Sequence, residues 1–116
     1  MLTLYGIPNC DTVKKARKWL EGQQLDYRFH DFRKDGLDNA QLQQWCKQLG
    51  WEALINTRGT TWRKLSDSER QVSNSEQAIA LMLANPSLIK RPVLDTGTTL
   101  HLGFKPELYQ SWLQPA

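Results

Sequence analysis

The spacing of apolar residues near the N-terminus predicts a strand, a helix and a second strand. A short apolar run at 2–5, which ends at Gly6, is typical of a strand. In residues 10–21 apolar and basic side chains fall on opposite faces at helical spacing, and Gly22 follows as the expected stop. Apolar and polar residues alternate in 25–30, as in a half-buried strand. Such a βαβ unit holds its two strands parallel.

The middle of the chain is predicted to be helical. Asp38 and Gln41 have the spacing of a capping box, at the start of an apolar-periodic segment that ends at Gly50. Ser73 and Glu76 have the same spacing and predict a helix that stops before the next proline. A shorter helix is expected in "TTWRKLSD". Together these helices form a predicted insert at about 37–85.

The C-terminal part of the chain returns to strand-like patterns. "RPVLD" and "TTLHLG" flank a turn at 96–97 and predict a β-hairpin, and Pro106 suits the first turn of a final helix. The element order is therefore βαβ, helical insert, ββα. We predict one α/β domain over residues 1–116, with a mixed four-stranded sheet and the insert between its two halves.

Composition limits the class of protein. A chain of 116 residues is long enough to bury a core without a disulfide or a metal. The net charge of +3 favours an anionic substrate or partner, but 12 acidic residues are dispersed among 15 basic ones, so direct nucleic-acid binding is not indicated. The N-terminus lacks a signal peptide pattern, and no apolar run reaches membrane-spanning length. With only two cysteines, we expect a reduced, cytoplasmic protein.

Cys10 is the main candidate for chemistry. It follows a strand and a Gly-x-Pro turn, and it lies where the first predicted helix begins. Unpaired backbone N–H groups and the helix dipole favour an anion at that place. A helix end contributes only about 0.3–2 kcal/mol, so full ionisation of the thiol also needs a nearby cation. An inert, buried cysteine at the helix start is the alternative.

Three other residues are weaker candidates. Cys46 lies on the apolar stripe of its predicted helix, and we expect it to pack in the core. Arg58 lies in a Gly-containing loop with two threonines, and Arg91 precedes Pro92. A guanidinium suits an oxyanion or a carboxylate, and a solvent-facing surface residue is the alternative for each arginine. A cis Arg91–Pro92 bond would explain a proline at a strand start, but composition alone does not establish it.

Three stretches in combination resemble the arsenate reductase family, the thioredoxin-like group that includes the ArsC, Spx and YffB proteins. They are "YGIPNCDTVKKARKWL", "INTRGTTWRKL" and "LIKRPVL", and the match spans nearly the whole chain. The combination is most similar to the YffB-type branch. The resemblance implies a thioredoxin-like fold, with a helical insert between the βαβ and ββα halves.

The resemblance also implies roles for individual residues. Cys10 matches the nucleophilic cysteine, and Arg58 and Arg91 match the arginines that surround its sulfur and hold the anionic substrate. Thr12 is assigned with them to anion binding. Pro92 matches the position of the cis-proline of thioredoxin-like folds. No metal is expected.

The function that the resemblance implies is that of a glutathione-dependent monothiol reductase, with glutathione as reductant or cosubstrate and glutaredoxin as a further partner. Arsenate reduction proper is one alternative, although Phe104, in "GFKPE", takes the place of the family's third arginine. An Spx-like regulator that binds RNA polymerase is the other. Spx-type proteins commonly carry Cys-x-x-Cys, whereas Val13 occupies the second position here. Any resolving thiol must therefore come from another molecule.

Overall fold

The computed structural model describes residues 1–113. Contacts divide the chain into two compact units. The first unit is Met1–Asp35 with the segment from Arg91 onward, and the second is Gly36–Lys90. The second unit has nearly the bounds of the predicted helical insert. That both units belong to a single domain stays a prediction.

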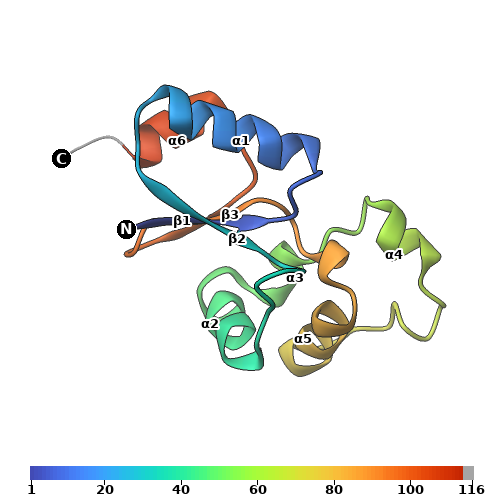
Figure 1. Ribbon diagram of the computed structural model, residues 1–116. Coiled ribbons are helices and arrows are strands. Elements are labelled where there is room, and N and C mark those ends of the chain that lie inside the picture. Colours follow the sequence, from blue (N-terminus) through green and yellow to red (C-terminus); the bar gives the residue numbers. More distant parts are fainter. Residues whose placement is uncertain (114–116) are drawn as a thin grey trace. The chain divides into compact units, whose positions relative to one another are not determined.

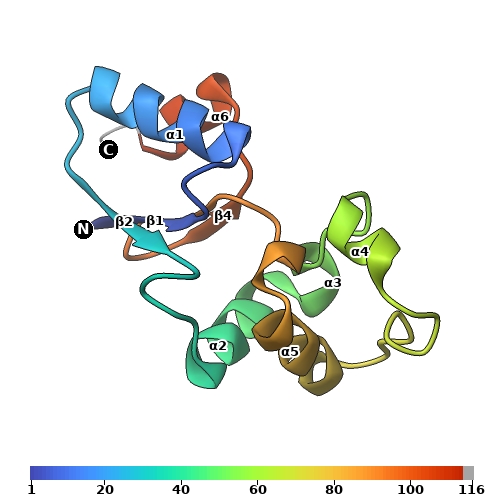
Figure 2. The same ribbon diagram turned by 45° about the vertical axis from the view of Figure 1, so that its right-hand side comes forward.

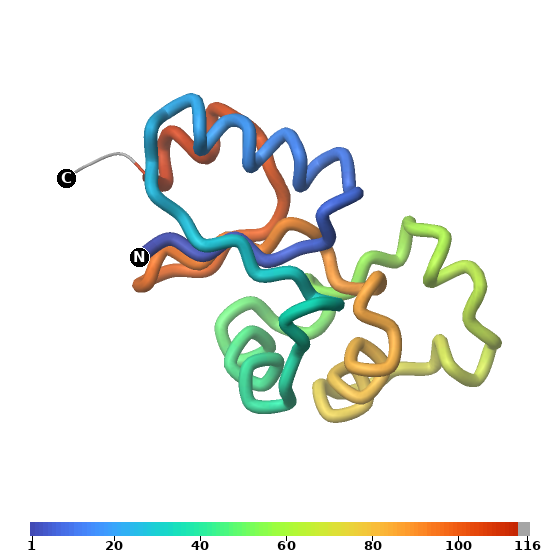
Figure 3. The backbone as a smooth tube through the Cα atoms, in the orientation of Figure 1, coloured from blue at the N-terminus to red at the C-terminus, as the bar shows by residue number. Residues whose placement is uncertain are grey.

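A mixed four-stranded sheet forms the centre of the first unit (Figure 1). β1 (Leu2–Gly6) pairs with β2 (Tyr27–Asp31) in parallel and with β3 (Val93–Asp95) in antiparallel. β3 also pairs with β4 (Leu100–Leu102) in antiparallel, which gives the order β2-β1-β3-β4. Figure 3 traces how β1 and β3, from opposite ends of the chain, lie side by side. This confirms the predicted parallel pair, the hairpin and the mixed sheet.

Two helices cover one face of this sheet. α1 (Asp11–Gly22) and α6 (Pro106–Trp112) lie next to each other above the strands, as both views show (Figures 1 and 2). The apolar core beneath them consists of fully buried side chains from the two helices and from the strands: Leu4, Ala16, Leu20, Leu94 and Tyr109. The apolar face predicted for residues 10–21 is therefore the face that packs on the sheet.

The C-terminal end of α1 differs from the prediction. Gly22 belongs to the helix, and Gln23 is the capping residue, whose N–H donates to the Trp19 carbonyl at 3.0 Å. The left-handed conformation falls on Gln24, with a φ of 56°. The N–H of Leu25 then donates to the Leu20 carbonyl at 3.1 Å. These backbone bonds satisfy the last carbonyls of the helix without glycine in the left-handed position.

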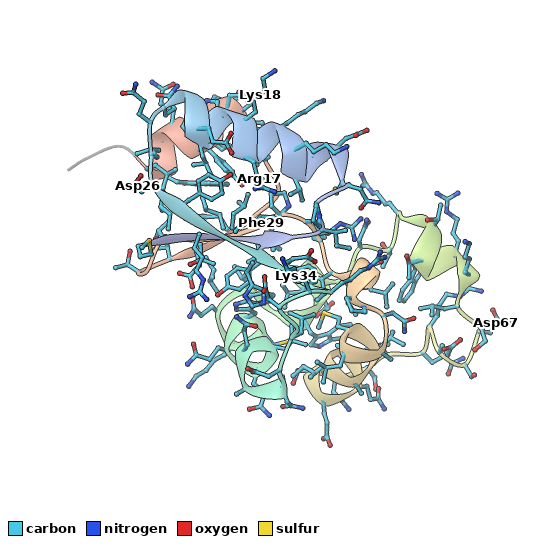
Figure 4. All side chains as sticks on the ribbon, viewed as in Figure 1. Arg17, Lys18, Asp26, Phe29, Lys34 and Asp67 are labelled. Carbon is cyan, nitrogen blue, oxygen red and sulfur yellow. The ribbon has the colours of Figure 1, made fainter. Side chains whose placement is uncertain are left out.

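One basic residue of α1 does not face solvent. The Arg17 guanidinium lies over the ring of Phe29, 4.1 Å from its centroid, and Figure 4 shows the two residues between α1 and β2. Its Nε donates to the Tyr27 hydroxyl at 3.0 Å, and that hydroxyl donates to Glu21 at 2.6 Å. Lys18 points away on the opposite side of α1 (Figure 4). Arg17 therefore connects α1 with β2, and the basic face predicted for this helix is narrower than expected.

The second unit is helical. It contains α2 (Asn39–Leu49), α3 (Trp51–Leu54), α4 (Thr60–Lys64), α5 (Ser75–Ala84) and the 3-10 turn η1 (Pro86–Leu88). α2 packs against α3 and α5. The side chains buried in this unit are apolar: Leu42, Trp45, Leu54, Ile55, Leu65, Ala78, Ile79, Met82, Leu88 and Ile89. Within residues 1–113, no helix combines the length and the apolar character that crossing a membrane requires.

The start of α2 is as predicted, and the start of α5 is one residue later than predicted. Asp38 caps α2 by accepting the Gln41 N–H at 2.7 Å. At α5 the capping residue is Asn74, which accepts the Gln77 N–H at 2.8 Å. Gln77 Oε1 accepts the N–H of Ser73 at 2.9 Å in return. Asn caps a helix as well as Ser does, and at Asn74 the Gln77 side chain also accepts the N–H of the residue before the cap.

We expect Gly6→Ala to destabilise the first unit, because β1 and α1 meet closely at this residue. A Cβ at position 6 would lie 2.7 Å from Cγ2 of Val13, which is fully buried. Valine has one favoured rotamer in a helix and cannot easily turn away. The expected cost is about 1–3 kcal/mol in the free energy of unfolding, measured by urea denaturation. Gly22→Ala is the control, since a Cβ there meets nothing within 4 Å. Equal stability of the two variants would contradict this reading of the contact.

Candidate active site

Cys10 lies at the start of α1, where the sequence predicts it. After β1 the chain turns, and the Cys10 N–H donates to the Ile7 carbonyl at 3.2 Å. Cys10 is the N-cap residue, with extended dihedral angles of φ −87° and ψ 127°. Its carbonyl accepts the Lys14 N–H at 2.9 Å and so begins the helical ladder. The side chain is half-buried, so the sulfur is neither enclosed in the core nor fully in solvent.

The surroundings of Cys10 lower the pKa of its thiol below the ordinary value. Burial is the largest single effect and raises the pKa. The backbone N–H of Val13, the Arg91 side chain through a hydrogen bond and its charge, and the backbone N–H of Thr12 lower it, and together they outweigh burial. The net direction favours the thiolate, which is the nucleophilic form. The backbone N–H groups of Val13 and Thr12 are among the unpaired donors that the sequence predicts at this helix start.

Strand pairing explains why Arg91 reaches Cys10. β3 runs antiparallel to β1, with Val93 opposite Tyr5. The residues that precede Val93 therefore run alongside the residues that follow Tyr5, which lead to Cys10. The Arg91–Pro92 peptide bond is cis, as the family resemblance implies, and the Pro92 carbonyl accepts the Gly103 N–H at 2.9 Å. A residue remote in sequence thus supplies the cation that the helix end alone lacks.

Thr12 and Arg58 are the other two residues assigned to anion binding. Thr12 acts on Cys10 through its backbone N–H, and anion binding by Thr12 stays a prediction. Arg58 belongs to the second unit, where it is exposed in the turn between α3 and α4. Its N–H donates to Asn56 Oδ1 at 3.1 Å, and its carbonyl accepts from Arg63 Nη2 at 3.1 Å. Anion binding by Arg58 also stays a prediction.

Cys46 is not a core residue, contrary to the expectation. Leu42 and Trp45 of the same helix are buried, whereas Cys46 is half-buried at the edge of their stripe. It borders a cavity of about 460 Å³ that α2 and α5 line within the second unit. Burial raises the pKa of its thiol. The thiol pKa is therefore shifted in opposite directions at the two cysteines: the site of Cys10 favours the thiolate, and that of Cys46 favours the neutral thiol.

The position of the family's third arginine is apolar in this chain. Phe104 packs edge-on against Tyr109, with ring centroids 4.7 Å apart, and belongs to the apolar cluster under α1 and α6. Lys105 beside it is exposed at the start of α6. Phe104 therefore supplies no positive charge. In the part of the chain that the structure describes, no three His, Cys, Asp or Glu side chains are grouped so that they could hold a metal ion.

Arg91→Ala is expected to raise the pKa of the Cys10 thiol, because it removes both a hydrogen bond to the thiolate and a positive charge beside it. The pH dependence of iodoacetamide alkylation at Cys10 measures this pKa. Arg91→Lys keeps the charge and should recover part of the effect. Lys90→Ala removes the exposed cation immediately before Arg91 and is the matched control. An alkylation profile of Arg91→Ala that coincides with the wild type would remove the role assigned to Arg91.

Comparisons with known proteins show the family and the fold of the chain. A model of the ArsC family matches residues 5–112. The solved structure of a YffB protein superposes with a TM-score of 0.91, at 46% identity over 96% of this chain and 97% of that one. An arsenate reductase (ArsC) related protein from Brucella melitensis superposes with a TM-score of 0.78, at 48% identity over 98% of this chain and 95% of that one. The global transcriptional regulator Spx of Streptococcus pyogenes is 30% identical over 97% of this chain and 85% of its own length.

Proposed function

Because the chain belongs to the ArsC family, we propose that it is a glutathione-dependent thiol oxidoreductase whose nucleophile is Cys10. The observation that carries the proposal is the lowered pKa of a half-exposed thiol at a helix start, beside Arg91. A thiolate at neutral pH attacks electrophilic sulfur directly and needs no separate base. The fold of the first unit supplies the helix end and the cation together.

In the proposed reaction the Cys10 thiolate attacks the glutathione sulfur of a mixed disulfide. A Cys10–glutathione disulfide forms, the original disulfide breaks, and the substrate leaves as a thiolate that takes a proton from water. A second glutathione, as thiolate, then attacks the glutathione sulfur of this adduct. Glutathione disulfide leaves and the Cys10 thiolate is restored. One substrate disulfide is reduced, and one new disulfide forms between two glutathione molecules.

A single thiol at the site fits this scheme. Val13 stands where a Cys-x-x-Cys pair would have its second cysteine, and burial raises the pKa of the other thiol of the chain, Cys46. The resolving thiol in the proposal is therefore glutathione. Glutaredoxin is a further proposed partner, and the cytoplasm is the proposed location because glutathione there keeps thiols reduced.

A turnover assay tests the proposal. We expect the protein to form glutathione disulfide from glutathione and a small glutathione mixed disulfide, coupled to glutathione reductase. Absence of this turnover, together with arsenate-dependent oxidation of glutathione when glutaredoxin is present, would favour arsenate reduction proper. The apolar Phe104 at the third-arginine position argues against that second activity, because it leaves an oxyanion with one cation fewer.

A regulator of the Spx type is the second candidate, favoured by the 30% identity to the streptococcal regulator. Pull-down from a cell lysate with and without glutathione separates the two functions. A stable complex with RNA polymerase and no thiol turnover would support the regulator. Turnover without such a complex would support the oxidoreductase.

A further inference from the structure

We propose that Tyr109 is a positioning residue that holds Arg91 beside the Cys10 sulfur. It acts through two consecutive hydrogen bonds, which lead from its hydroxyl to Gly103 and from Gly103 to Pro92, the residue that follows Arg91. The inference deepens the proposed function and rests on it, because Arg91 and Cys10 are the cation and the nucleophile of that proposal. All the residues involved belong to the first unit.

Pro92 is attached to the sheet through its carbonyl. Proline has no backbone N–H, so the carbonyl is the one main-chain group of Pro92 that can form a hydrogen bond. It accepts the Gly103 N–H at 2.9 Å. This bond lies one residue beyond the last pair of the ladder between β3 and β4, in which Val93 is opposite Leu102. The main-chain position of Pro92, and of Arg91 before it, therefore depends on Gly103.

Gly103 needs other residues to fix its conformation. Glycine is the least restricted residue, and Gly103 has a φ of 83°, in the left-handed region just after β4. The Tyr109 hydroxyl donates to the Gly103 carbonyl at 2.8 Å, so hydrogen bonds hold the peptide groups on both sides of this glycine. Without the tyrosine hydroxyl, the carbonyl loses this donor and the dihedral angles of Gly103 are less restrained.

Tyr109 is itself held in place. Its side chain is fully buried. Its ring lies edge-on to Trp19 of α1 and to Phe104, with centroids 5.8 and 4.7 Å away. Burial raises the pKa of the Tyr109 hydroxyl, which therefore stays protonated over the pH range in which cysteine thiols titrate. The hydroxyl thus remains a donor to Gly103 at every pH at which the state of Cys10 changes.

The Arg91 side chain completes the series of contacts at the sulfur. It forms a hydrogen bond with Cys10 and places its charge beside the thiol, and both effects favour the thiolate. A hydrogen bond weakens steeply when its angle departs from linear, so a change in the Arg91 backbone reduces this contribution. The charge acts over a longer distance than the hydrogen bond does. Loss of positioning therefore removes part of the effect of Arg91, whereas Arg91→Ala removes all of it.

The pH dependence of Cys10 alkylation by iodoacetamide tests the inference. We expect Tyr109→Phe to move the midpoint of the rate to higher pH, by roughly a quarter to a half of the shift that Arg91→Ala causes. Phenylalanine keeps the ring contacts and removes the hydroxyl alone. Circular dichroism shows that each variant is folded under the conditions of the experiment. In folded protein, a loss of stability alone does not move the midpoint.

Tyr27→Phe is the matched control. It removes a tyrosine hydroxyl of the same unit, which forms hydrogen bonds with Arg17 and Glu21. These bonds connect α1 with β2 and include neither Gly103 nor Pro92. We expect Tyr27→Phe to keep the wild-type midpoint at Cys10.

An Arg91→Ala background shows whether Tyr109 acts through Arg91. Two substitutions that affect the same interaction are not additive. In the Arg91→Ala background, Tyr109→Phe should therefore move the midpoint no further. An additional shift of the same size as in the wild type would mean that Tyr109 affects the thiol by another route.

Gly103→Ala tests the second hydrogen bond without changing Tyr109. A Cβ at Gly103 meets nothing within 4 Å, but a residue with a Cβ disfavours a φ of 83°, so the substitution alters the backbone without a clash. We expect the Cys10 midpoint to rise, as in Tyr109→Phe. Gly97→Ala is the control, because Gly97 has a φ of 95° at the opposite end of the same hairpin. It should leave the midpoint unchanged.

Three results would overturn the inference. In the first, Tyr109→Phe keeps the wild-type midpoint. In the second, Tyr27→Phe shifts the midpoint as far as Tyr109→Phe does, so the effect is a general loosening of the unit. In the third, Tyr109→Phe causes the same shift with and without Arg91. The glutathione turnover assay is independent of all three. Absence of turnover together with the expected midpoints would contradict the proposed function and not the arrangement around Cys10.

Discussion

Cys10→Ser abolishes glutathione-linked disulfide reduction, with an expected loss of about 10³-fold or more in turnover. A serine hydroxyl at a helix start stays protonated at neutral pH, so neither the helix end nor Arg91 can convert it into a comparable nucleophile. Glutathione disulfide formation, coupled to glutathione reductase, is the measurement. The fold should be unaffected, because serine is a better N-cap residue than cysteine.

Cys46→Ser is the matched control for this experiment. It removes the chain's other thiol, whose pKa is raised by burial and which lies in the second unit. We expect turnover within about twofold of the wild type. If Cys46→Ser lost activity and Cys10→Ser retained it, the nucleophile would be Cys46 and the proposed mechanism would be wrong.

Tyr109→Ala is expected to cause the largest loss of stability, about 3–5 kcal/mol in the free energy of unfolding. Tyr109 belongs to α6, and its side chain is fully buried in the core of the first unit. Its ring lies edge-on to Trp19 and Phe104, with centroids 5.8 and 4.7 Å away, and tilted 5.6 Å from Trp112. Truncation removes all three contacts and leaves a cavity in the apolar core that α1, α6 and the sheet share. Urea denaturation followed by tryptophan fluorescence measures the change.

Two variants separate the parts of this effect. Tyr109→Phe keeps the ring and loses the bond from its hydroxyl to the Gly103 carbonyl, 2.8 Å long, at an expected cost of about 1–2 kcal/mol. Leu108→Ala changes the neighbouring residue, which is 41% exposed, and should stay within about 0.5 kcal/mol of the wild type. If Tyr109→Ala were no more destabilising than Leu108→Ala, the ring would not support the core as described.

Elements with a local signal were predictable from the sequence. The apolar stripe of α1 and the Asp38 cap of α2 depend on residues within one helix. The hairpin depends on a turn at Gly97, whose φ is 95°. Short elements such as α3 and η1 show no periodicity that a pattern could detect. The order of the strands also has no local signal, because it depends on contacts between distant segments.

The structure differs from the prediction where contacts with other residues determine the orientation of a side chain or the residue that caps a helix. The sequence position of Arg17 predicts a solvent-exposed side chain beside the lysines of α1. Instead its side chain contacts Phe29 and Tyr27 of β2. At α5 two residues with similar capping strength compete; Asn74 caps the helix by accepting the Gln77 N–H, and the Gln77 side chain accepts the N–H of Ser73. Propensities alone rank such alternatives as nearly equal.

The candidate site was predictable in part. The helix start at Cys10 follows from the sequence, because a strand, a turn and an amphipathic segment occur in order. The proximity of Arg91 does not follow from spacing and was implied only by the family resemblance. The register that places Val93 opposite Tyr5 now gives the physical reason. Arg58 lies in the second unit, and its assignment stays a prediction.

The central claim is that the site lowers the pKa of the Cys10 thiol and so favours its thiolate, and the rate of Cys10 alkylation by iodoacetamide as a function of pH tests this most directly. Because the pKa of Cys10 is lowered and that of Cys46 is raised, the Cys10 rate should fall only at a lower pH than the rates of Cys46 and free cysteine. The chain thus provides its own internal control. A midpoint for Cys10 at or above that of free cysteine would contradict the account.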